Sequence, residues 1–392
     1  MSTNDNNPKW SLPDSSHFII TSIAGLGRAV IARTDIAQGH HLLKTTVTQS
    51  PLAHVILRPY RREVCAWCFN YDRGRTWKIR DSITSTAFCT VDCHLCWKQQ
   101  HDQVCLQALA QVEARIKDLL KRYGDEPPLV EAGYAAEDQA AHDAMVAKTW
   151  QDTEEVADEL RSARAIAKPS KWQKSIMRKV LERRVDVDIL TYALCGVLAA
   201  YRNVTQDNVD SRISGSQIIA PELCLPSLFE LVPDERVFND NPMTPSPLHD
   251  YTSAYLILLT LAPSKLLTVL TSELIVNLAS RAAHNAFSIR PADNADGEQS
   301  GEFLGWGIWP AASFFNHSCR PNVEKERIGR QWSFFVNRRN RSGVRNGQQL
   351  CITYLGGDEA DLDVHQRRQR LEEQWGFICG CERCVEEGGA PI

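Results

Sequence analysis

The chain has 392 residues, 43% of them hydrophobic and 23% charged, so it has a globular composition and room for two or three domains. A formal net charge of −4 gives no overall basic field, so direct nucleic-acid binding is not expected. Residues 1–16 lack the apolar core of a signal peptide, and no run of eighteen apolar residues is present. We therefore expect no membrane span and no secretion, and we place the chain in the nucleus and/or the cytoplasm.

The 13 cysteines are clustered at spacings typical of metal ligands, which favours zinc sites in a reducing compartment over disulfide bonds. In the first cluster, Cys65-x2-Cys68 is followed by Cys89-x3-Cys93. These four thiols can complete one tetrahedral zinc site, and such a site would help a module too small to bury a large core.

The second cluster is the C-x-C-x2-C run of Cys379, Cys381 and Cys384, whose members are too close together to be independent. The run can wrap one metal ion and leaves a fourth ligand position. The candidate for that position is Cys319, which lies in the segment Phe315-Asn-His-Ser-Cys-Arg-Pro-Asn322.

Strands and helices are predicted around these clusters in chain order. Residues 17–57 carry short apolar runs and turns, which predict strands. Apolar repeats at three- and four-residue steps predict helices over 106–123, which ends at Gly124, over 135–167 and over 189–201. A further helix is predicted after Pro169, with an apolar stripe that begins at Trp172. Residues 203–250 are rich in Asn, Asp, Ser and Pro and are predicted as loops, and 251–286 return to helix. Strands over 332–336 and 350–354 and a helix over 363–374 complete the series.

Three motifs carry a resemblance to a known family. The Asn-His-Ser-Cys-x-Pro-Asn segment, the strand that ends at Tyr354 and the C-x-C-x2-C tail resemble the SET domain of protein lysine methyltransferases. The run Cys89…Cys93…Trp97…His101…Cys105 is similar to a MYND zinc finger. The chain thus resembles the SET-and-MYND proteins, and more closely the short fungal members, over about 17–107 and 250–385.

The resemblance implies an α+β fold of small curved sheets with a pseudoknot near Asn316 and Tyr354. It divides the chain into an N-terminal SET part (15–60), a MYND-like finger (61–107), a helical insertion (108–250), a C-terminal SET part (251–360) and a post-SET zinc tail (361–392). The activity implied is S-adenosylmethionine-dependent methylation of a lysine in a histone or other protein, and the finger implies binding to protein partners.

The resemblance also assigns roles to single residues. Tyr354 is the catalytic hydroxyl that orients the amine and the methyl group. The residues that contact the cofactor are Gly25, Leu26, Gly27, Asn285, Asn316, His317, Tyr354 and Phe377, and the substrate channel is lined by Phe287, Trp375 and Phe377.

Two departures from the family pattern matter. Nothing between Phe69 and Phe88 is Cys or His, so the second cysteine pair of a full MYND finger is missing, and a second finger site built from Cys96, His101 and Cys105 is expected to be degenerate or absent. Trp375 stands where several relatives carry a channel tyrosine, and this leaves the number of methyl groups open. The alternative to an enzyme is a catalytically inactive adaptor that recruits partners. A zinc hydrolase is disfavoured, because closed cysteine sites are structural.

Overall fold

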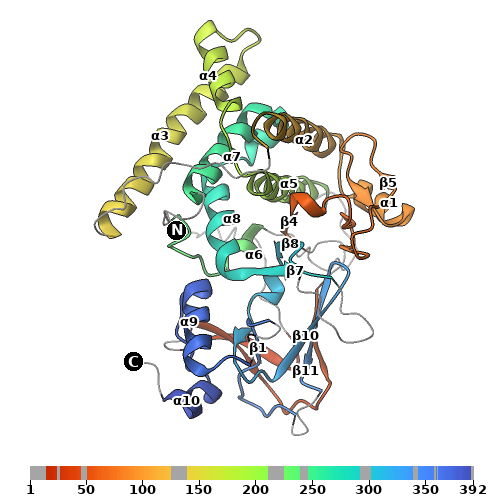
Figure 1. Ribbon diagram of the computed structural model, residues 1–392, viewed down its shortest axis with the longest axis vertical. Helices are drawn as coiled ribbons and strands as arrows, with labels where there is room; N and C mark the ends of the chain where they lie inside the picture. The colour runs from red at the N-terminus through yellow and green to blue at the C-terminus, as the bar shows by residue number, and fades with distance from the viewer. Residues whose placement is uncertain are drawn as a thin grey trace, which may run out of the picture.

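The computed structural model describes residues 15–23, 27–45, 51–124, 139–210, 225–238, 246–291, 302–338, 343–356, 359 and 361–389. The fold is α+β, as predicted. Small sheets at one end of the molecule hold strands from both ends of the chain, and the central helices gather at the other end (Figure 1).

The strands form small separate sheets with mostly antiparallel pairing. Two of the sheets have three strands, in the orders β10-β11-β3 and β4-β8-β7, and the other pairs are β1-β2, β5-β6 and the parallel pair β9-β12. The bounds are β1 Phe18–Ile23, β2 Gly27–Ala32, β3 His41–Lys44, β4 Ala53–Ile56, β5 Ile79–Arg80, β6 Ala87–Phe88, β7 Ala286–Ile289, β8 Gly305–Ile308, β9 Asn316–His317, β10 Val323–Ile328, β11 Gln331–Val336 and β12 Cys351–Ile352.

Helices fill the middle of the chain and its end. The bounds are α1 Val91–Gln99, α2 Gln103–Tyr123, α3 Gln139–Ala165, α4 Lys171–Leu181, α5 Val187–Asp210, α6 Leu225–Phe229, α7 Pro247–Leu261, α8 Ser272–Asn285, α9 Val364–Trp375 and α10 Glu382–Gly388, with 3-10 turns η1 Arg58–Tyr60, η2 Ser264–Thr268 and η3 Pro310–Ala312. In the described part of the chain, none of the helices has the length and apolar character that a membrane crossing needs.

The pairing of β4 with β8 joins the N-terminal part of the chain to its last third. Two glycines of β8 allow the strands to approach closely. A Cβ at Gly305 would lie 2.1 Å from the carbonyl oxygen of Val55, and a Cβ at Gly307 would lie 2.9 Å from the Cβ of His54. Larger residues at these two positions would clash with β4. The glycines therefore allow the Gly-Trp-Gly-Ile segment to be the central strand of its sheet.

One continuous hydrophobic core connects the sheets to the helices. It extends from Phe18 of β1 to Ile352 of β12 and includes most of α7, which is buried from Leu248 to Thr260 except at His249. Helix α5 packs against both β4 and α7. The helical insertion is therefore part of the same core as the sheets.

The helix predictions hold at most ends and fail in two places. The helix over 106–123 does end at Gly124, whose φ is +73°, and α9 ends at Gly376 in the left-handed conformation. The prediction that residues 203–250 are loop is wrong in part, because α5 continues to Asp210, α6 lies within this range and α7 begins in it. The Thr205 hydroxyl bonds back to the carbonyl of Tyr201, so a polar residue continues the helix there. Trp172 is 59% exposed and so does not belong to the buried stripe of α4.

The parallel pair of β9 and β12 brings two sequence motifs side by side. Cys351 pairs with Asn316 and Ile352 with His317. The Asn322 amide strengthens the junction, because it donates to the carbonyl of Gln349 and accepts from the backbone N–H of Cys351, each at 2.8 Å. This places Tyr354 next to the Asn-His segment, as the predicted crossing near Asn316 and Tyr354 requires.

Candidate active site and metal centres

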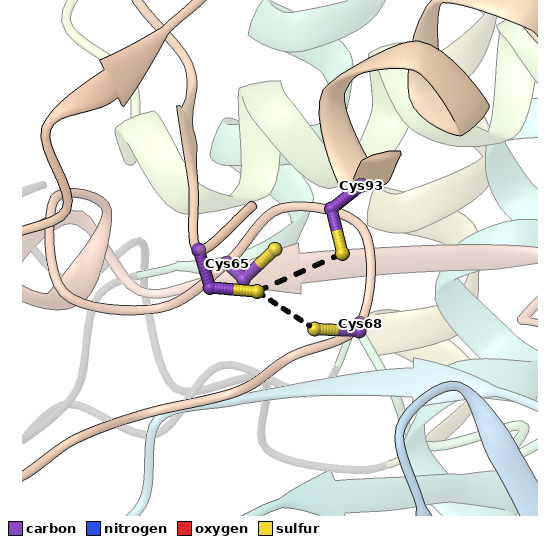
Figure 2. Close-up of side chains that lie close together, drawn as sticks. Cys65, Cys68 and Cys93 are labelled. Atoms are coloured by element: carbon purple, nitrogen blue, oxygen red, sulfur yellow. Dashed lines mark hydrogen bonds between the residues drawn. The ribbon is translucent and has the colours of Figure 1, made fainter. Parts of the chain in front are cut away.

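The four cysteines of the first predicted zinc site lie together. Their Sγ atoms are all within 4.8 Å of one another, and Cys89 is 3.5 Å from Cys68 and 3.6 Å from Cys93. Figure 2 shows the thiols of Cys65, Cys68 and Cys93 converging from a loop and from the start of a helix. Four thiols at these separations suit a tetrahedral zinc ion.

Local backbone structure holds this finger cluster in place. The N–H of Phe69 donates to the carbonyl of Cys65, which turns the first Cys-x2-Cys pair back on itself. Thr90 caps α1 by accepting from the N–H of Cys93, which fixes the second pair. A hydrogen bond from Cys68 lowers the pKa of Cys65 to about 5, so one thiolate forms readily.

The doubtful second finger site is not assembled by the residues that the structure describes. Among the described residues, Cys96, His101 and Cys105 do not form a group of ligand atoms within binding distance. The Nδ1 of His101 is 2.7 Å from the carbonyl of Trp97, and its Nε2 faces the guanidinium of Arg202 at 3.4 Å, so both ring nitrogens are engaged. Burial raises the pKa of Cys105 to about 12, which keeps this thiol neutral.

The tail cluster matches the prediction that Cys319 joins the C-x-C-x2-C run. The four Sγ atoms lie within 4.8 Å of one another, and Cys319 is 3.5 Å from Cys384 and 3.9 Å from Cys379. The backbone N–H of Cys319 donates to the sulfur of Cys381. Hydrogen bonds from Cys319 and Cys379 hold the pKa of the Cys381 thiol far below its usual value. This donor set also fits a closed zinc site.

A buried arginine that belongs to none of the sequence motifs supports the tail cluster. Arg367 of α9 is 0% exposed; it donates to Cys384 Sγ at 3.6 Å and to Glu387 at 2.6 Å. It lies three residues after Val364 and four before Leu371, which are also buried. Helical spacing from these two apolar residues is the signal that could have found it.

His317 connects the tail cluster to Tyr354. Its Nδ1 accepts from the backbone N–H of Tyr354 at 2.9 Å, and its Nε2 lies 3.2 Å from the Cys319 sulfur. Burial lowers the pKa of His317 to about 4, so the ring is neutral and its proton belongs on Nε2, facing the sulfur. A metal ligand and the predicted catalytic tyrosine are thus held by one imidazole.

Aromatic rings surround Tyr354. Its hydroxyl donates to the carbonyl of Phe315 at 3.0 Å, and burial raises its pKa, so it stays protonated. The ring centroid lies 5.5 Å from that of Trp375, 6.3 Å from that of Phe377 and 5.4 Å from that of His317. The structure therefore brings together the predicted catalytic residue and two of the predicted channel residues.

The third predicted channel residue, Phe287, lies on β7 with its ring 5.1 Å from Trp332 and 6.2 Å from Trp309. The amine of Lys325 lies 5.4 Å from the Phe287 ring centroid and donates a hydrogen bond to the carbonyl of Thr353, the residue before Tyr354. Phe287 and the Tyr354 segment therefore border the same small region.

The predicted cofactor contacts are only partly described. Gly25 and Leu26 lie outside the described residues. Gly27 has a φ of +69°, and among the described residues nothing lies within 4 Å of a Cβ placed there, which leaves room for a ligand beside its backbone. The Asn316 amide donates to the carbonyl of Arg28, which ties the segment after Gly27 to the central motif.

Asn285 is the last residue of α8 and is 9% exposed. Its amide nitrogen donates to the carbonyls of Val232 and Arg281, at 2.8 and 2.9 Å. A contact with the cofactor would therefore use the side-chain oxygen, or would need these bonds to break. Its predicted cofactor role stays a prediction.

Comparisons with known proteins point to the same family that the motifs indicate. No protein-family model matches the chain. The chain is 36% identical over 143 residues to SET6, a potential protein lysine methyltransferase of Saccharomyces cerevisiae, and the aligned segment covers 36% of each chain. It is 33% identical over 120 residues to a SET and MYND domain-containing protein of Dictyostelium discoideum (30% of this chain, 21% of that one). It is 32% identical over 95 residues to the Homo sapiens protein-lysine N-trimethyltransferase SMYD5 (24% and 22%).

Among solved structures, a match is the crystal structure of the SET domain of LSMT bound to lysine and AdoHcy, with a TM-score of 0.24 and 15% identity over 93% of this chain and 52% of that one. The aligned segments span about a third or less of the curated relatives named above. The resemblance to SET-and-MYND proteins is confirmed by the sequence relatives.

Proposed function

We propose that this chain, whose sequence relatives are SET-type lysine methyltransferases, is itself an S-adenosylmethionine-dependent protein lysine N-methyltransferase. The observation that carries the proposal is the setting of Tyr354. Its hydroxyl is fixed on the carbonyl of Phe315, its ring lies beside Trp375 and Phe377, and its backbone is held by His317.

S-adenosylmethionine, when bound, supplies an activated methyl group. The residues predicted to hold it that the structure describes are Gly27, Asn285, Asn316, His317, Tyr354 and Phe377. At Gly27, no described atom would meet an added Cβ within 4 Å, which leaves room for such a ligand. The protein's task is then to position a lysine amine and keep it neutral, because a charged ammonium has no lone pair for the transfer.

The residues around Tyr354 suit both tasks. An aromatic enclosure disfavours the charged form of a buried lysine, so it shifts the amine toward its neutral form. The Tyr354 hydroxyl and the carbonyl of Phe315, 3.0 Å apart, offer fixed dipoles that can orient an amine without reorganising at the moment of transfer.

The finger supports a second role in binding protein partners. Ile83, Val91 and Leu95 are apolar residues of the finger that are 51%, 58% and 52% exposed. These side chains are the described apolar groups of the finger that a partner would cover.

The test is transfer of labelled methyl groups from S-adenosylmethionine to proteins of an extract. We expect label on a discrete band with the unchanged chain and a loss of about 100-fold or more with Tyr354→Phe, which removes one fixed dipole at the reacting centre. Tyr123→Phe is the matched control, because Tyr123 is an exposed tyrosine at the end of α2. Absence of label from a folded, zinc-loaded chain would favour the adaptor alternative.

A further inference from the structure

Lys325 is a lysine whose amine lies between the Phe287 ring and the carbonyl of Thr353, the residue before Tyr354. It lies on β10, and its Nζ donates to the carbonyl of Thr353 at 2.8 Å and sits 5.4 Å from the centroid of the Phe287 ring. Its own side chain is half-buried, and burial lowers its pKa to about 8. An amine in such a position is unusual and calls for a physical explanation.

The alternation of β10 explains why this lysine points inward. Successive side chains of a strand point to opposite faces. Glu324 and Glu326, on either side of Lys325, reach Arg338 with separations of 3.8 and 3.6 Å. Among the described residues, the ion pairs of this strand involve these two glutamates and not Lys325. The amine is thus held by a carbonyl and a ring face, and no carboxylate of the described residues pairs with it.

A carbonyl and an aromatic face are also the groups that the proposed channel offers to an incoming lysine. Thr353 precedes Tyr354 directly, and Phe287 is a predicted wall of the channel. A substrate amine that enters between them meets the Lys325 amine at the same carbonyl. A protonated substrate lysine that arrives there is repelled by the Lys325 ammonium, and a neutral one competes with Lys325 for the same carbonyl.

We propose that Lys325 is the resident amine of the lysine channel and that a substrate lysine must displace it to bind. This inference rests on the proposed function, since it assigns the region between Phe287 and Tyr354 to the substrate. Lys325 thereby lowers the affinity of the channel for lysine. The channel then favours substrates whose flanking residues supply further binding energy.

The first experiment measures binding without catalysis. N-acetyl-lysine methylamide is titrated by calorimetry into the unchanged chain and into Lys325→Met, both with S-adenosylhomocysteine present. Methionine keeps an apolar stem of similar length against Phe287 and removes the amine. We expect binding about tenfold tighter in Lys325→Met, because one competing contact worth about 1.4 kcal/mol has gone.

Two further variants serve as controls for this measurement. Lys44→Met is the matched control, because Lys44 is an exposed lysine of β3 in the same sheet, and it should leave affinity unchanged. Lys325→Arg keeps the charge and should not gain affinity. Equal or weaker binding in Lys325→Met, or binding to neither chain at millimolar concentration, overturns the proposal.

The second experiment separates this inference from the proposed function. Methyl transfer to a peptide library with one fixed central lysine is measured for the unchanged chain, Lys325→Met and Tyr354→Phe. A lower KM with similar kcat in Lys325→Met supports displacement. A fall in kcat with unchanged KM contradicts it. If no chain transfers methyl groups but Lys325→Met still binds the lysine amide more tightly, the proposed function fails and the channel assignment stands.

Discussion

His317 shows how one residue can serve two sites. Its ring accepts from the backbone of Tyr354 on one side and faces the sulfur of Cys319 on the other. Since a neutral imidazole has one donor and one acceptor, each nitrogen has a single role and the ring cannot rotate without losing both contacts. If the tail cluster lost its order, His317 would lose its contact with Cys319 and would no longer hold the backbone of Tyr354 in place.

Lys325 gives a prediction about stability and pH at the same scale. Its pKa is about 8 in the folded chain, below the ordinary value of 10.5, so the unfolded chain binds this proton more tightly. Below pH 8 the folded chain carries the full cost of the buried charge, and this cost disappears as the pH rises from 8 to 10.5.

Lys325→Met removes that cost. We expect the variant to be more stable than the unchanged chain by about 1–2 kcal/mol at pH 7, a value reduced from the pKa shift because the side chain is half-buried. The difference should shrink between pH 8 and 10.5. Urea unfolding at pH 7, 8.5 and 9.5 checks this, with Lys44→Met as the control. A difference that does not change with pH would mean that Lys325 is solvated.

At the scale of elements, sequence patterns predicted the helices better than the sheets. Gly124 ends α2 and Pro169 separates α3 from α4 where expected, because each has a backbone preference that acts locally. The cysteine spacings also predicted most ligands of both clusters, because the ligands within each pair or run lie close together in the chain. In contrast, the pairing of β4 with β8 joins residues far apart in the chain, and no local signal specifies it.

The candidate site was predictable in its motifs and not in its contacts. The Asn-His segment, Tyr354 and the cysteine tail are visible in the sequence, and the structure brings them together. The roles of Lys325 and Arg367 depend on which neighbours a strand face or a helix face meets. Strand alternation predicts that Lys325 and Glu324 point to opposite faces of β10, but it does not predict that the face of Lys325 contacts Thr353 and Phe287.

The two clusters give a prediction about metal content. We expect two zinc ions per chain, because two sets of four thiols lie within ligand distance. Cys379→Ser and Cys89→Ser should each retain about one ion, since each removes one ligand of a four-ligand site. Cys105→Ser is the matched control and should retain two. Elemental analysis after dialysis measures the content.

The variants also separate the roles of the two ions. Cys379→Ser should lose methyl transfer, because Cys319 and His317 link its cluster to Tyr354. A third ion in the unchanged chain, or one lost in Cys105→Ser, would show that the degenerate finger site does bind metal.

At the scale of the whole molecule, the continuous core predicts how the chain unfolds. The main hydrophobic cluster includes strands from both ends of the chain and the buried faces of α2, α5 and α7. The tail has a smaller cluster of its own, made of Leu355, Val364, Leu371, Cys379 and Cys384. Sheets and helical insertion should therefore unfold together, and the tail should depend on its metal ion.

We expect calorimetry of the zinc-loaded chain to show one main transition. With a strong chelator below the transition temperature, hydrogen exchange followed by mass spectrometry should show lost protection in α9, α10 and the segment around Cys319, with α5 and α7 still protected. The physical reason is that the tail has too few buried apolar side chains to remain folded without its four-thiol site. Two separate transitions in the zinc-loaded chain, with the helices melting apart from the sheets, would contradict a shared core and would place the helical insertion in a domain of its own.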